Sequence, residues 1–114
     1  MKQVDPDINQ ATLDSLRNVR RKLFAVPETE LSAMSSDDQV TYGANLHQMG
    51  LAILKLETAQ LKGVNDAFKA EEAKLKEAAA ALEADSAALK DAVTFIRAIS
   101  EGLSVVTKLI SLLG

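Results

Sequence analysis

The sequence predicts an all-α protein in which a short N-terminal helix accompanies a long helix with a seven-residue apolar repeat. Glycine occurs five times and proline twice among 114 residues, which is too few for a turn-rich β fold. Alanine, the strongest helix former, supplies eleven of the 26 residues from Ala67 to Ala92. Length and composition together predict a single helical domain over residues 1–114.

The first helix is expected over residues 6–25. Asp5 can accept hydrogen bonds from free N–H groups at the helix start, and Pro6 suits the first helical position because that position needs no donor. Apolar residues then recur at helical spacing until Pro27 ends the pattern. Residues 26–36 follow as a connector that is long enough to reverse the chain direction.

The second helix is expected to begin near Asp37, after a cap at Ser36, and to continue to residue 113. Large apolar residues recur in it at nine consecutive positions spaced by seven, the pattern of a coiled coil. We call these nine residues the heptad seam: Leu54, Leu61, Phe68, Leu75, Leu82, Leu89, Ile96, Leu103 and Ile110. Neither glycine nor proline interrupts residues 64–101, so we expect one continuous helix, either coiled-coil-like or in a helical bundle. The alternative is a compact three-helix bundle with a break near Asp85 and Ser86.

The C-terminal part of the long helix, residues 92–114, is amphipathic and more apolar than the middle. Its polar residues form one stripe, so a single partner helix would leave part of its apolar surface uncovered. The face expected to contact another subunit or a membrane consists of Phe95, Ile99, Val106, Leu109 and Leu113. A 20-residue first helix cannot cover so long a seam, so we expect a homo-oligomer or a helical protein partner.

A basic cluster near the end of the first helix is the one candidate anion site. It consists of Arg17, Arg20, Arg21 and Lys22. These side chains could meet phosphate or an acidic lipid surface, or they could simply place cations where the helix dipole favours them.

Metal and catalytic sites are not predicted. The one histidine, His47, has neither cysteine nor a Glu-x-x-His pair to accompany it, so it is not expected to bind a metal. Glu71, Glu72 and Glu77 alternate with lysines, as on a solvated helix face. No nucleophile–base motif, phosphate loop or cofactor motif occurs, so we expect no cofactor and no enzyme activity.

Charge and hydropathy limit the possible partners and location. A net charge of −3 with an acidic middle makes nucleic acid an unlikely partner. The N-terminus lacks an apolar signal-peptide core, and no conventional transmembrane helix is evident. By default this predicts a cytoplasmic protein.

Three functions remain open from the sequence. The first is a non-enzymatic structural or interaction protein that self-associates through the heptad seam. The second is a soluble component of a membrane-active, pore-forming-like helical assembly that hides residues 92–114 until it assembles. The third is a helical inhibitor or adaptor that docks in a groove of a partner protein.

Overall fold

The computed structural model describes residues 2–87 and 91–113, and these residues confirm the all-α class. Within them the chain forms five α-helices and a final 3₁₀ turn, and no β-strand. The elements are α1 (Pro6–Phe24), α2 (Glu28–Ala33), α3 (Ser36–Lys62), α4 (Asp66–Ala87), α5 (Ala92–Ile110) and η1 (Ser111–Leu113).

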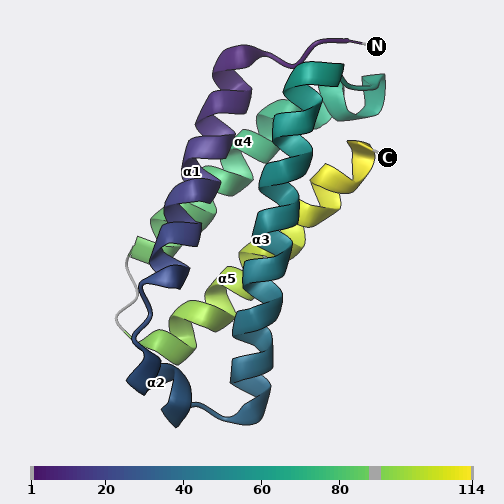
Figure 1. Ribbon diagram of the computed structural model, residues 1–114. Helices are drawn as coiled ribbons and strands as arrows, with labels where there is room; N and C mark the ends of the chain where they lie inside the picture. Colours follow the sequence, from purple (N-terminus) through teal and green to yellow (C-terminus); the bar gives the residue numbers. More distant parts are fainter. Residues whose placement is uncertain (1, 88–90, 114) are drawn as a thin grey trace.

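The four long helices form a bundle that measures 47 × 23 × 18 Å. In Figure 1, α1 and α3 lie in front, while α4 and α5 cross behind them. Helix α1 packs against α3 and α4, and α5 packs against the same two helices from the other side. Successive long helices run in opposite directions (Figure 1). The apolar faces of all four meet in one core.

The helix expected to be continuous over residues 37–113 is instead divided into α3, α4 and α5. The first division lies at Gly63, whose φ of 86° is readily adopted only by glycine. Val64 then exchanges two backbone hydrogen bonds with Lys2, of 2.6 and 2.8 Å, which ties the N-terminal segment to this turn. The Asn65 side chain accepts the N–H of Phe68 at 2.8 Å and so caps the start of α4. Folding back at this turn lets the seam residues of α4 and α5 be buried by the same chain.

The second division lies close to the break that the three-helix alternative placed near Asp85 and Ser86. Helix α4 continues through both residues to Ala87, and α5 begins at Ala92 after a cap at Asp91. Because the chain also turns at Gly63, the bundle has four long helices rather than three.

The N-terminal elements follow the expected order with two differences. Helix α1 begins at Pro6 as expected, with Asp5 accepting two N–H groups, and ends at Phe24, one residue early. The connector over residues 26–36 contains a short helix, α2. The cap of α3 is Ser35 rather than Ser36, because the Ser35 hydroxyl accepts the N–H of Asp38 at 3.2 Å.

Candidate functional site

Most of the heptad seam lies inside the bundle. Six members on α4 and α5 are at most 3% exposed: Phe68, Leu75, Leu82, Ile96, Leu103 and Ile110. Each large apolar side chain buried in this way stabilises the fold by roughly 1.5–3 kcal/mol relative to exposure. The seam on these helices therefore has partners within the same chain. Leu89 lies outside the described residues.

The seam has the opposite orientation on α3. The buried face of that helix is formed by Asn45, Met49, Ala52, Ile53, Leu56 and Ala59. Side chains that are two residues apart on a helix point in directions about 200° apart. Leu54 therefore points away from the side on which Ala52 and Leu56 are buried. As a result Leu54 is 59% exposed and Leu61 is 88% exposed.

These two leucines belong to an exposed face that we call the outer stripe of α3. Its large members also include Val40, which is 72% exposed, and Leu51, which is 37% exposed. The complete stripe is Val40, Gly43, Ala44, His47, Gly50, Leu51, Leu54, Thr58 and Leu61. It contains no Asp, Glu, Lys or Arg, although it faces solvent in this chain. The pattern that would have revealed it is the pair Gly43 and Gly50, spaced by seven within a helix.

The face of residues 92–114 that was expected to meet a subunit or a membrane is turned inward. Phe95, Ile99 and Val106 are at most 5% exposed. Leu109 and Leu113 are half-buried against the same core. Helices α3 and α4, which both pack against α5, therefore supply the cover that one partner helix could not. None of the helices in the described part of the chain is long and apolar enough to cross a membrane.

The structure brings three of the four residues of the basic cluster together. Arg17, Arg20 and Arg21 surround Phe24, which is 66% exposed, in a shallow depression on α1. Arg17 also pairs with Glu57 of α3, at 3.1 Å between nitrogen and oxygen. Lys22 lies apart from them, beside α2 and the start of α5.

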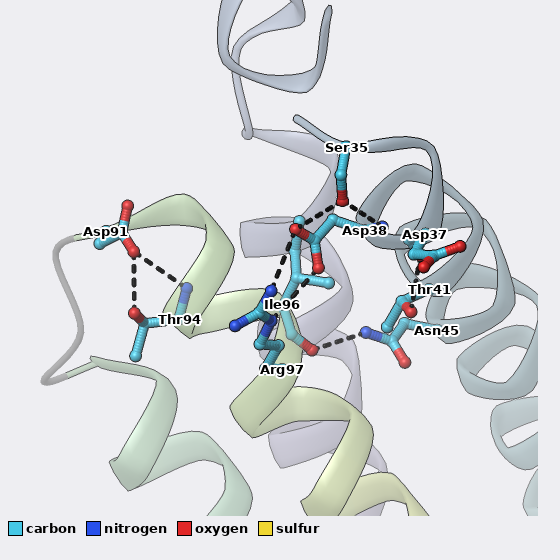
Figure 2. A network of polar contacts seen from close by, with 9 residues as sticks. All are labelled: Ser35, Asp37, Asp38, Thr41, Asn45, Asp91, Thr94, Ile96 and Arg97. Carbon is cyan, nitrogen blue, oxygen red and sulfur yellow. Dashed lines mark hydrogen bonds and ion pairs between the residues drawn. The ribbon is translucent and has the colours of Figure 1, made fainter. Parts of the chain in front are cut away.

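A polar network joins the beginnings of α3 and α5. Figure 2 shows the Arg97 guanidinium facing the Asp38 carboxylate, with two contacts of 3.2 and 3.3 Å. Ser35 donates its hydroxyl to the same carboxylate at 3.0 Å, and buried Asn45 donates to the Ile96 carbonyl at 2.9 Å. Within the described residues, no buried side-chain nitrogen or oxygen lacks a hydrogen-bond partner. The network fixes how α3 and α5 pack at this end of the bundle.

Two titratable groups near this end have shifted pKa values. Asp91 accepts the hydroxyl of Thr94 at 2.8 Å and its N–H at 3.2 Å (Figure 2), and these bonds hold the Asp91 pKa below its usual value. Tyr42 donates its hydroxyl to the Leu23 carbonyl at 2.8 Å, joining α3 to the end of α1. Partial burial raises the pKa of this phenol.

The acidic residues of α4 have structural partners. Glu72 is buried, pairs with Lys69 at 2.8 Å and accepts the N–H of Asp5 at 3.2 Å, so it fastens the start of α1 to α4. Glu71 pairs with Lys74 on the surface, and Glu77 is exposed. His47 is exposed within the outer stripe of α3. Residues 2–87 and 91–113 contain no group of three potential metal ligands.

No family model, curated protein or solved structure matches this chain. Of the surfaces described above, the outer stripe of α3 stands out, because it gathers four exposed large apolar side chains on one helix.

Proposed function

We propose that this chain is a non-enzymatic helical interaction protein and that its docking surface is the outer stripe of α3. The observation that carries the proposal is the exposure of Val40, Leu51, Leu54 and Leu61 along one helix face without an intervening charge. Contiguous exposed apolar patches usually mark interaction sites in folded proteins. Two seam members, Leu54 and Leu61, thus keep the role that the heptad repeat suggested.

The rest of the bundle suits a scaffold for such a surface. Most large apolar residues of α1, α4 and α5 are used in the core, and paired polar groups hold the start of α3 against α5. A docking face on a helix that is fixed in this way needs little ordering on binding, which favours affinity. Acid–base catalysis needs several positioned groups that converge on a substrate, but the stripe carries one ionisable side chain, His47. The stripe therefore suits docking better than catalysis.

Photocrosslinking tests the proposal directly. A photoreactive phenylalanine analogue in place of Leu54 should form a discrete protein adduct, because the stripe contacts its partner there. The matched control carries the analogue in place of Val105 on α5, which is 52% exposed but lies outside the stripe. Mass spectrometry then identifies the adduct, and Leu61→Glu in the same chain should suppress it. Equal adducts from both positions, or none from position 54, would show that the stripe is not a docking surface.

A second candidate function is binding to anionic lipid surfaces through α1. It is favoured by the exposed Phe24 among Arg17, Arg20 and Arg21, since basic residues around an exposed aromatic ring suit such surfaces. A pore-forming role would in addition require α5 to leave the core. Cosedimentation with vesicles that contain phosphatidylserine, compared with phosphatidylcholine alone, tests the idea. The Arg20→Glu, Arg21→Glu double variant should lose binding, and equal binding of both proteins would contradict it.

A further inference from the structure

The two ends of the outer stripe of α3 carry opposite charges. Asp37 is exposed at the N-terminal end of the helix, and Lys62 is exposed at the C-terminal end. They are 25 residues apart, about seven helical turns, so both lie along the same flank of the stripe. Among the described residues neither side chain forms an ion pair, since the nearby pairs use Asp38 with Arg97 and Lys2 with Asp66.

Apart from Ala44, the positions of the stripe are also symmetric about its midpoint. Val40 and Leu61 mark its ends, about 32 Å apart along the helix, and the midpoint falls between Gly50 and Leu51. If two such stripes met in antiparallel orientation, each Gly50 would face the partner's Leu51, and each Val40 would face the partner's Leu61. Small residues would therefore oppose large ones at the centre, and Asp37 would lie beside the partner's Lys62 at both ends.

Gly43 and Gly50 of the stripe are not explained by packing within the chain. A glycine inside a helix costs about 1 kcal/mol relative to alanine. A Cβ atom added at Gly43 or Gly50 would meet nothing within 4 Å, so packing within the chain does not require glycine at either position. Close approach of a second helix does require small residues at its points of contact.

We propose that the stripe is occupied by the α3 stripe of a second copy of this chain, running antiparallel, to form a two-fold symmetric dimer. The proposal rests on the function proposed above and names the partner for the same surface. Charge complementarity favours this occupant: an antiparallel copy pairs Asp37 with the partner's Lys62 twice, whereas a parallel copy forms neither pair and places like charges at the same end of the contact. A two-fold contact of this kind uses the same patch on both subunits.

Sedimentation velocity of the purified full chain over a wide concentration range gives the first test. The wild-type protein should approach twice the chain mass of 12.2 kDa. Leu54→Glu should remain monomeric with an unchanged circular dichroism spectrum, since this side chain is 59% exposed in the single chain. Val105→Glu is the matched control and should dimerise normally. A monomeric wild-type protein, or a dimer that Leu54→Glu does not affect, overturns the proposal.

A charge swap tests the orientation. Asp37→Lys or Lys62→Asp alone should raise the dissociation constant of the dimer roughly 2- to 30-fold, because each breaks two surface ion pairs. The double variant should restore it. Both substitutions oppose the helix dipole of α3, so the double variant cannot recover by folding better. Failure of the double variant to recover excludes the antiparallel pairing.

The crosslinking product at position 54 separates this inference from the proposed function. A crosslink between two copies of the chain supports both the docking surface and its occupation by a second copy. A product with a different, identified protein keeps the docking surface but overturns the second copy as its occupant. The absence of any product overturns both.

Discussion

Two helical glycines of this protein have opposite surroundings, so alanine should have opposite effects at the two positions. At Gly50 an added methyl group meets open space, and Gly50→Ala should stabilise the monomer by up to about 1 kcal/mol. At Gly102 the added Cβ would collide with the Leu82 side chain, so Gly102→Ala should destabilise it by roughly 1–3 kcal/mol. Urea unfolding in a Leu54→Glu background, which removes any contribution from dimerisation, measures both. Stabilisation at Gly102 or a loss at Gly50 would contradict these packing environments.

The cap at Asp91 predicts a pH-dependent contribution to stability. Its pKa is lowered in the folded protein, mainly by the hydrogen bond from the Thr94 hydroxyl, so its contribution is full above the unfolded pKa, about 3.9. This contribution is lost as the pH falls through the folded pKa. Asp91→Ala should therefore lower the melting temperature at pH 7. The difference in melting temperature between the variant and the wild type should become smaller in acid. A difference that stays constant from pH 7 to about 2.5 would exclude this linkage.

The heptad seam divides into a buried part on α4 and α5 and an exposed part on α3, and this division can be tested with one pair of variants. Leu75→Ala removes a side chain that is 2% exposed, so it should cost about 2–5 kcal/mol of unfolding free energy. Leu54→Ala, at 59% exposure, should change the stability of the monomer by less than about 0.5 kcal/mol. Denaturant unfolding of dilute protein measures both changes. Equal losses of unfolding free energy would mean that Leu54 and Leu75 are buried in the same interface, which contradicts this division.

The seven-residue repeat identified apolar residues on α4 and α5, such as Leu75 and Ile96, that are buried. It assigned them to contacts with a second subunit, whereas they pack within one chain. The sequence also located α1 to within one residue. It did not predict the turn at Gly63, since the repeat happens to keep its phase across that turn although the two helices point different faces at the core. The chain turns at Gly63 because glycine readily adopts a positive φ, and the spacing of apolar residues does not reveal such a turn.

The candidate surface was less accessible to sequence reasoning than the fold. The heptad repeat predicts Leu54 and Leu61 as contact residues, but nothing in their spacing distinguishes them from Leu75 or Leu82. Leu54 and Leu61 are exposed because a second face of α3, which runs from Asn45 to Ala59, packs into the core instead. A helix with two apolar faces shows which one is free only when its neighbours are known.

At the scale of the whole molecule, one distance separates the bundle from an extended helix. Spin labels at Ser36 and Glu101 would be roughly 98 Å apart on a continuous helix. The bundle is 47 Å long along its longest axis, and Asp38 contacts Arg97 near the labelled sites. Pulsed electron resonance on labelled chains diluted into unlabelled chains should therefore give a short intrachain distance. A distance beyond 60 Å would rule out the four-helix arrangement.

The hydrogen bonds from Asp5 to Glu72 and from Asn18 to Glu83 join residues 67 and 65 positions apart in the chain. Helix α1 leaves the ribosome before α4, which it packs against and which is made only after α3. At about 5–20 residues per second, this separation amounts to about 3 to 13 s of synthesis. During that interval α3 alone can cover α1, and leucines such as Leu13 and Leu16 stay partly in water. Until α4 has been made, these leucines of α1 are exposed to any protein that binds apolar segments of a nascent chain.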